Sequence, residues 1–214
     1  MPRELVEYTR KSSVKSPAIF YLAVEGQKTE VHYFLELNHK LRDSRFKLEV
    51  VPRLDPTHSA PKHVLASMKS HLQGLESRGA DDQFWIVIDR DSWPDKQLVE
   101  VAIEAAEKKI KIAFSNPCFE VWLLFHFYAI ANLGELKKIS KKRNIKDKLV
   151  SALRAELGQY NPNKPPFEIL YPMTRAAIEN AISVTPEEQW FESIGSSVHV
   201  LMSELHHELG FKIE

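Results

Sequence analysis

Apolar runs of strand length alternate with amphipathic runs of helix length through the first 130 residues. The expected strands are 19–24, 47–53, 83–93 and 110–117, and the expected helices that follow them are 27–42, 62–77, 94–109 and 118–130. Such an alternation is typical of a parallel sheet with helices on both faces. The sequence therefore predicts an α/β fold with a parallel sheet of about four strands.

The remainder of the chain has a different pattern, with helical runs only, at 134–160, 172–183 and 196–209. We expect residues 1–16 to be a flexible basic lead-in and residues 17–130 to form the α/β domain. Residues 131–214 are expected to be a helical extension packed on that same domain. A chain of 214 residues can bury a sizeable core, which is compatible with one domain.

Charge and cysteine content narrow the class of protein. The chain has 29 basic and 29 acidic residues, and this balance argues against a broad basic surface of the kind that coats nucleic acid. The single cysteine, Cys118, excludes an intrachain disulfide and favours a reducing compartment. The most apolar stretch, 121–130, is too short to span a bilayer, and no signal peptide is apparent. We expect a cytoplasmic protein without membrane association.

Two aspartates, Asp89 and Asp91, follow the buried run 85–88 at a spacing of two. If the strand continues to Asp91, their side chains share a face of the sheet. Carboxylates held close together repel each other and raise each other's pKa, and a cation between them removes that cost. The motif therefore predicts a metal site that needs partners from elsewhere in the chain.

Further carboxylates are expected at the same edge of the sheet. Glu25 ends the first strand, and Glu30 and Glu120 lie near the starts of the helices after the first and fourth strands. If strands one and three are neighbours, these three and the two aspartates converge on one crevice, where ligands of parallel sheets bind. Oxygen ligands of this kind suit Mg²⁺, with Mn²⁺ as an alternative, and a pair of such ions can clamp a phosphodiester.

Each acidic residue taken alone also has a simpler interpretation. Glu25–Gly26 can be an ordinary turn at a strand end, and an Asp-x-Asp pair often arises by chance. Glu30 and Glu120 can merely stabilise the positive end of a helix. Their joint placement at the ends of successive strands favours the metal site.

Several polar residues are candidates for substrate binding. Lys28, Arg90 and Asn116 lie beside the acidic positions, where they could meet a phosphate. The basic run 137–148 could follow a nucleic-acid backbone, because lysines neutralise phosphates. The simpler alternatives are a solvated loop lysine, an arginine paired with an acid, a helix-capping asparagine and a solvated helix face.

Four segments, "AIFYLAVEGQKTEVHYF", "FWIVIDRDSW", "FSNPCFEVWLLFHF" and "SSVHVLMSEL", resemble the RloB-like family of the wider Toprim group in content and order. The resemblance covers nearly the whole chain. It implies a Toprim-like (Rossmann-like) sheet, with Glu25 as general acid/base or metal ligand and Asp89 and Asp91 holding Mg²⁺. Glu30 and Glu120 match further acidic residues of OLD-type nucleases. The resemblance also implies prokaryotic anti-phage defence beside an ATPase partner of AAA or ABC type.

The leading hypothesis is a Mg²⁺-dependent nuclease or related phosphodiester-cleaving enzyme acting on DNA or RNA. One alternative is a non-catalytic or regulatory partner subunit, since a chain of zero net charge has little electrostatic attraction for nucleic acid. Another is a phosphatase of the Asp-x-Asp type, but in those enzymes the pair ends the first strand, whereas here it ends the third. The sequence leaves open the choice of DNA or RNA, the number of metals and self-association.

Overall fold

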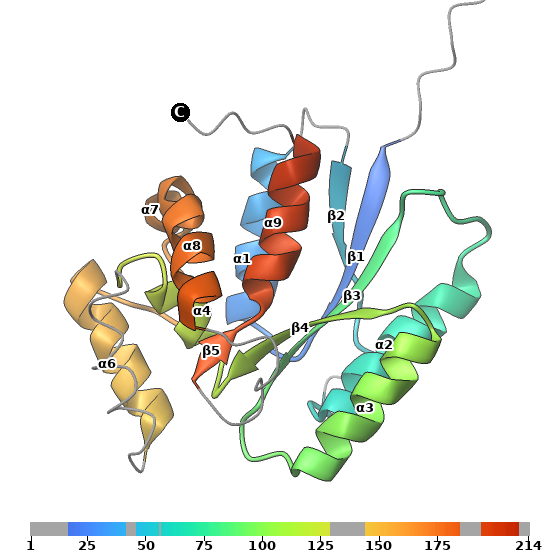
Figure 1. Ribbon diagram of the computed structural model, residues 1–214, viewed down its shortest axis with the longest axis horizontal. Helices are drawn as coiled ribbons and strands as arrows, with labels where there is room; N and C mark the ends of the chain where they lie inside the picture. Colours follow the sequence, from blue (N-terminus) through green and yellow to red (C-terminus); the bar gives the residue numbers. More distant parts are fainter. Residues whose placement is uncertain (1–16, 42–45, 56, 129–143, 185–193, 210–214) are drawn as a thin grey trace, which may run out of the picture.

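The computed structural model describes residues 17–41, 46–55, 57–128, 144–184 and 194–209. Within them a five-stranded sheet runs in the order β2-β1-β3-β4-β5 (Figure 1). The strands are β1 (Ala18–Val24), β2 (Phe46–Val50), β3 (Gln83–Asp89), β4 (Lys111–Asn116) and β5 (Gly195–Ser196). The first four are parallel and β5 is antiparallel to β4. The predicted α/β fold with a parallel sheet of about four strands is confirmed, and the predicted lead-in, 1–16, lies outside the described residues.

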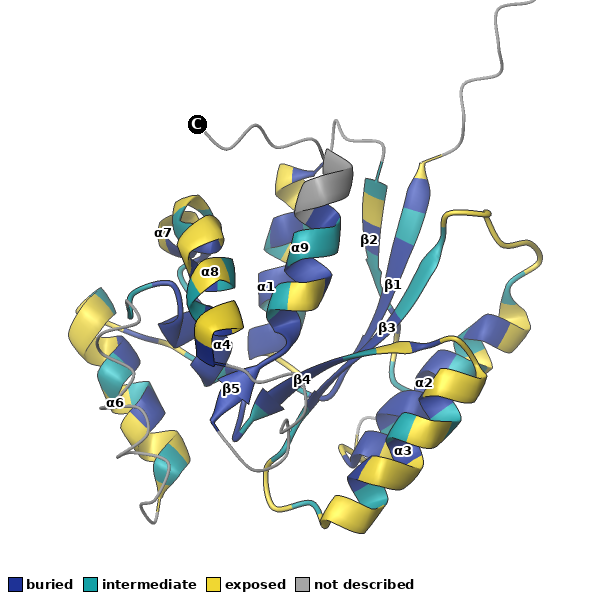
Figure 2. Cartoon of the chain, viewed as in Figure 1, coloured by how far each residue is buried: buried dark blue, intermediate teal, exposed yellow. Residues whose placement is uncertain are grey.

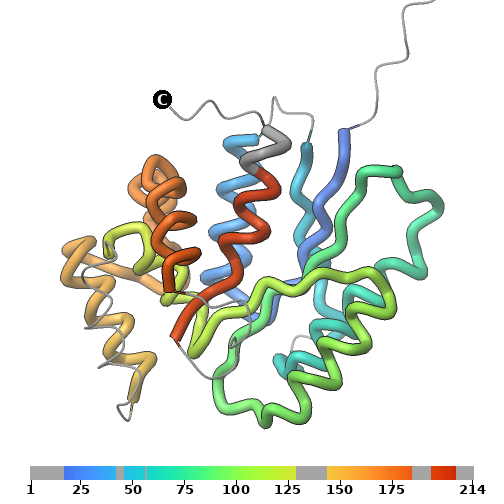
Figure 3. Tube along the Cα trace, viewed as in Figure 1, coloured from blue at the N-terminus to red at the C-terminus, as the bar shows by residue number. Residues whose placement is uncertain are grey.

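Helices cover both faces of the sheet, as predicted (Figure 1). One face carries α2 (Pro61–Gly74) and α3 (Asp95–Glu107). The first and last helices, drawn blue and red in Figure 3, cover the other face together with several further helices. The helices of that face are α1 (Thr29–Lys40), α4 (Glu120–Leu124), α6 (Ile145–Leu157), α7 (Phe167–Leu170), α8 (Thr174–Val184) and α9 (Val198–Leu209), with a 3-10 turn at Tyr171–Met173.

The alternation of side chains along β1 divides the core into two layers. Phe20 and Leu22 point into the layer under α1 and α9, whereas Tyr21 and Ala23 point into the layer under α2 and α3. The buried surfaces of the helices face the sheet accordingly (Figure 2). Burial on both faces explains why β1 reads as a continuous apolar run rather than an alternating one.

The third strand is shorter than predicted, and the prediction that it extends to residue 93 is wrong. β3 ends at Asp89, and Asp91 has a φ of 38°. The backbone N–H groups of Arg90 and Asp91 donate to the carbonyl oxygens of Ser115 and Pro117, at 2.7 and 2.9 Å. These bonds turn the chain over the end of β4, and aspartate tolerates a left-handed conformation better than most residues.

Two further elements differ from expectation. The predicted helix 118–130 is represented by α4, which covers Glu120–Leu124 only, and residues 129 and 130 lie outside the described part. The short strand β5 lies where the sequence predicted a helix start at Ser196. No helix among the described residues combines the length and the apolar character needed to cross a membrane.

Candidate functional site

Glu25 lies at the carboxyl end of β1, beside the end of β3, because the two strands are neighbours in the sheet. Its backbone N–H continues the ladder by donating to the Val87 carbonyl at 2.9 Å. Its carboxylate accepts the Asp89 backbone N–H at 2.9 Å and the Trp93 indole N–H at 3.0 Å. The side chain is only 8% exposed. Glu25 is therefore held in one position between the end of β3 and the loop that leads to α3.

Glu30, the second residue of α1, is buried and folds back over Gly26. A Cβ atom built on Gly26 would overlap the Glu30 carboxylate, so the absence of a side chain at position 26 makes room for the acid. The Glu25–Gly26 pair is thus more than a turn. It supplies one carboxylate and leaves space for a second.

Replacing Gly26 with alanine should displace the Glu30 carboxylate. The added methyl group would overlap the Glu30 carboxylate, so this buried side chain must move, and we expect a loss of stability of about 1–3 kcal/mol. Urea unfolding measures this loss, with Gly74→Ala as the matched control, because nothing lies within 4 Å of a Cβ atom there. Equal effects in the two variants would contradict the packing of Glu30 against Gly26.

Four carboxylates influence one another electrostatically at this edge. Burial raises the pKa of Glu30 to about 7, with further contributions from the charges of Glu120 and Glu25. Burial also raises the pKa of Asp89 well above its ordinary value, followed by repulsion from Glu30, Glu25 and Glu120. The pKa of Glu25 is raised chiefly by burial. The structure therefore brings together Glu25, Glu30, Asp89 and Glu120, from β1, α1, β3 and α4.

Asp91 is paired with a lysine, although its charge also raises the pKa of Glu25. Its carboxylate accepts a hydrogen bond at 2.9 Å from the ammonium group of Lys146 on α6. The Lys146 charge also acts to lower the pKa of Asp89 and of Glu25, so the lysine is a counter-ion to these two members of the cluster as well. Burial lowers the pKa of Lys146, but its bond to Asp91 and the nearby negative charges outweigh burial and raise that pKa overall.

The donor atoms suit a hard divalent cation, but they do not form a finished ligand set. Among the residues that the structure describes, no group of three or more His, Cys, Asp or Glu side chains is arranged to hold a metal ion. Both oxygens of Glu25 accept protein hydrogen bonds, and Asp91 is paired with Lys146. A cation would therefore have to compete with these partners.

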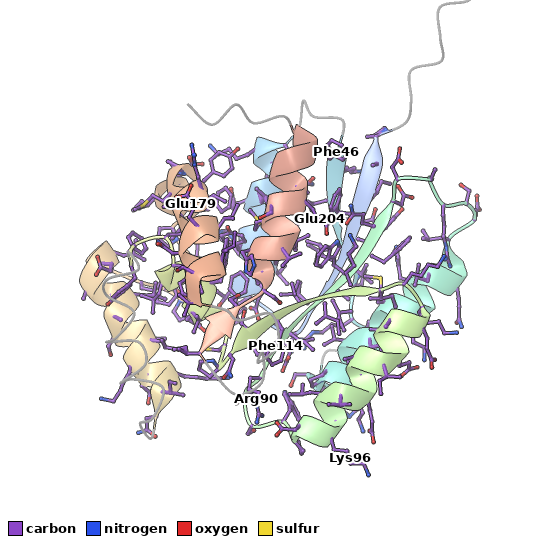
Figure 4. The ribbon with its side chains drawn as sticks, in the orientation of Figure 1. Phe46, Arg90, Lys96, Phe114, Glu179 and Glu204 are labelled. Carbon is purple, nitrogen blue, oxygen red and sulfur yellow. The ribbon has the colours of Figure 1, made fainter. Side chains whose placement is uncertain are left out.

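The three predicted substrate-binding residues have different surroundings. Arg90 lies at the lower edge of the sheet in Figure 4, where its guanidinium pairs with Asp95 at 2.7 Å and also donates to the Trp93 carbonyl. These two contacts hold the loop between β3 and α3 in one conformation. Lys28 is exposed just before α1, and half-buried Asn116 ends β4. Phosphate binding by these three residues stays a prediction.

Sequence reasoning missed two contributors to the site and undervalued a third. Trp93 ends the quoted motif "FWIVIDRDSW", but nothing in the pattern indicated that its indole would bind Glu25. Tyr160 lies in the loop after α6, far from any motif, and its ring is 6% exposed. Lys146 belongs to the basic run 137–148, which the sequence offered only as a candidate for nucleic-acid binding, whereas the structure pairs Lys146 with Asp91. Of this run the structure describes only residues 144–148.

Cys118 is a free thiol packed in the core. It is buried, and burial raises the pKa of its thiol well above the usual value, followed by the nearby charges of Glu120 and Asp89. The thiol also donates a hydrogen bond to Glu120. Cys118 therefore supports the position of Glu120 from the buried side.

Comparison with known proteins identifies one family. The family model described as RloB-like protein matches residues 20–205. No curated protein and no solved structure matches the chain. The matched range begins within β1 and ends within α9, so it includes every acidic residue of the cluster. Because the match spans most of its length, the chain belongs to the RloB-like protein family.

Proposed function

We propose that the protein is a Mg²⁺-dependent nuclease, or a related enzyme that cleaves phosphodiester bonds, with Mn²⁺ as an alternative ion. The observation that carries this proposal is the convergence of Glu25, Glu30, Asp89 and Glu120 at the carboxyl ends of neighbouring parallel strands. Buried like charges destabilise a fold unless protons or a cation neutralise them. A second, independent observation is the buried Tyr160 hydroxyl beside the cluster, which has no partner among the described residues.

The side chains divide into metal ligands and groups that act on the substrate. The ion would be held by Asp89, Glu30 and Glu120. Asp91 would become a further ligand by giving up its bond to Lys146. A bound divalent ion would supply Lewis-acid stabilisation of the phosphoryl oxygens. Glu25, whose pKa is raised above the ordinary value chiefly by burial, would act as general acid/base or as a further ligand.

Lys146, which is the counter-ion of Asp91 in the metal-free protein, would be free to bind the substrate once Asp91 binds the metal. The side chain of Lys146 is 48% exposed, so it is open to solvent. Released from Asp91, it would be a free cation beside the phosphodiester, and such a group stabilises the extra negative charge of the transition state.

The biological setting is proposed from the family. We propose that the protein acts in the cytoplasm in prokaryotic anti-phage defence, on DNA or RNA, beside an ATPase subunit of AAA or ABC type. The charge balance of the chain supports a partner. With 29 basic and 29 acidic residues, the chain has little general attraction for phosphates. A second subunit would supply the missing affinity for nucleic acid.

The test is a cleavage assay on labelled DNA and RNA, in Mg²⁺, in Mn²⁺ and in EDTA, combined with calorimetric titration of each ion. We expect binding of both ions, and cleavage of at least one nucleic acid that stops in EDTA. Cleavage that persists in EDTA would contradict a metal-dependent mechanism. Absence of metal binding by the wild-type protein would contradict the site itself.

The pairing of Asp91 with Lys146 favours one further candidate, a regulatory subunit whose acidic site is completed only in a complex. Such a subunit would bind a metal weakly alone and cut nothing. Copurification separates the two functions. A regulatory subunit should elute with an ATPase and confer cleavage only on that complex, whereas an enzyme should retain metal-dependent cleavage as a purified single chain.

A further inference from the structure

Tyr160 lies in the loop between α6 and α7, close enough to the acidic cluster for the charges of Glu120 and Glu30 to raise its pKa. The loop is attached to the start of α1, because the Thr29 hydroxyl donates to the carbonyl oxygen of Pro162. Thr29 precedes Glu30 in the chain, so the attachment point is immediately beside the buried acid. The tyrosine ring is 6% exposed, and the loop therefore holds it inside the protein at the edge of the site.

The phenol hydroxyl of Tyr160 is buried, and within the described part of the chain it has no hydrogen-bond partner. The nearby Thr29 hydroxyl gives its own hydrogen to the carbonyl oxygen of Pro162. Burial raises the pKa of Tyr160 above its usual value, and the charges of Glu120, Cys118 and Glu30 raise it further. The phenol therefore remains protonated, as a donor that faces acidic groups.

A buried donor without an acceptor is unfavourable, by about 1–3 kcal/mol. Tyrosine hydroxyls buried in proteins usually find a partner, and phenylalanine would fill the same space without that cost. A tyrosine at this position is explained if its hydroxyl gains a hydrogen-bond acceptor in another state of the protein, such as the metal-bound state. Among the nearby charges, that of Glu120 raises the Tyr160 pKa most, and the Cys118 thiol also interacts with Glu120.

We propose that Tyr160 is a positioning residue of the acidic site, whose phenol donates a hydrogen bond to the Glu120 carboxylate when Glu120 binds a divalent cation. The inference rests on the proposed function, because it requires Glu120 to be a metal ligand. Carboxylate ligands are commonly held by hydrogen bonds from a surrounding shell, and loss of such a partner typically weakens metal binding by about 10- to 100-fold.

Tyr160→Phe tests this assignment, since it removes the hydroxyl and keeps the ring. Tyr33→Phe is the matched control. Tyr33 is also fully buried with an unpartnered hydroxyl, but it packs in the aromatic core against Phe119 and Phe167. We expect Mn²⁺ titration by calorimetry to give about 10-fold weaker binding for Tyr160→Phe. Binding by Tyr33→Phe should equal that of the wild type.

Thermal unfolding separates positioning from a purely structural effect. In EDTA the hydroxyl has no partner to lose, so the melting temperature of Tyr160→Phe should equal or exceed that of the wild type. In Mn²⁺ the metal-induced rise of the melting temperature should be smaller in this variant than in the wild type.

Three results would overturn the inference. Wild-type metal affinity in Tyr160→Phe would remove the role of Tyr160 and leave the proposed function intact. A fall in melting temperature of this variant in EDTA, equal to that in Mn²⁺, would make the hydroxyl structural. Absence of metal binding by the wild type would overturn this inference together with the metal site itself.

Discussion

Replacing Asp89 with asparagine should abolish metal-dependent cleavage and at the same time make the metal-free protein more stable. Asp89 ends β3 at the centre of the acidic cluster, and the proposed ion depends on its charge. Loss of several kcal/mol of transition-state stabilisation from the metal corresponds to a decrease in rate on the order of 10³-fold or more. Stability should change in the opposite direction, because the same charge is unfavourable without the ion.

The sign of the stability change follows from the pKa of Asp89. Burial, and then repulsion from Glu30, Glu25 and Glu120, raise this pKa above its unfolded value. A carboxyl group with a raised pKa destabilises the fold once the pH exceeds the unfolded pKa, so the wild type carries this cost at neutral pH. Asparagine has nearly the same shape and no charge. The melting temperature in EDTA should rise by roughly 2–4 °C for each kcal/mol of repulsion removed.

The measurement is a pair of melting curves in EDTA, together with the cleavage assay in Mg²⁺. Asp81→Asn is the control, because Asp81 is an exposed aspartate that precedes β3 at the opposite end of the strand. It should leave both properties unchanged. If Asp89→Asn melts at a lower temperature than the wild type in EDTA, the charge of Asp89 does not destabilise the metal-free fold.

The sheet and its acidic edge were predictable because both depend on local pattern and on one geometric rule. Doubly buried strands such as β1 read as continuous apolar runs, and the ends of parallel strands meet at one edge. Once β1 and β3 are neighbours, Glu25 and Asp89 must lie close together. Gly26 could also have indicated the packing of Glu30, since a missing side chain often marks a close approach.

The remaining features of the site depend on contacts between distant segments. Asp91 leaves the strand because two backbone bonds to the end of β4 turn the chain there. Lys146 reaches Asp91 from a helix 55 residues further along the chain. Tyr160 approaches the cluster through a loop attached to α1. No local periodicity or spacing encodes such pairings, so a single sequence does not reveal them.

Glu30 should make the stability of the metal-free protein depend on pH. Its pKa is raised from an ordinary 4.5 to about 7, by burial first and then by the charges of Glu120 and Glu25. Below pH 4.5 the group is protonated in both the folded and the unfolded state and has no effect. As the pH rises from 4.5 to 7 the unfolded chain loses this proton first, so the folded state becomes progressively less favourable.

Glu30→Gln should remove this dependence. The difference in free energy of unfolding between the variant and the wild type should be small near pH 4.5 and reach on the order of 3 kcal/mol, in favour of the variant, above pH 7. Urea unfolding in EDTA at several pH values measures it. Glu36→Gln on the same helix is the control, because that side chain is 37% exposed and substitutions at such positions usually change stability by less than about 0.5 kcal/mol.

Adding Mg²⁺ extends the same experiment to the metal site. A cation that binds the ionised cluster replaces the proton, so saturating Mg²⁺ should restore the stability of the wild type above pH 7 and do less for Glu30→Gln. A wild type that gains stability between pH 4.5 and 7 in EDTA would contradict the raised pKa of Glu30. Equal gains from Mg²⁺ in both proteins would show instead that Glu30 is buried for packing and does not bind the ion.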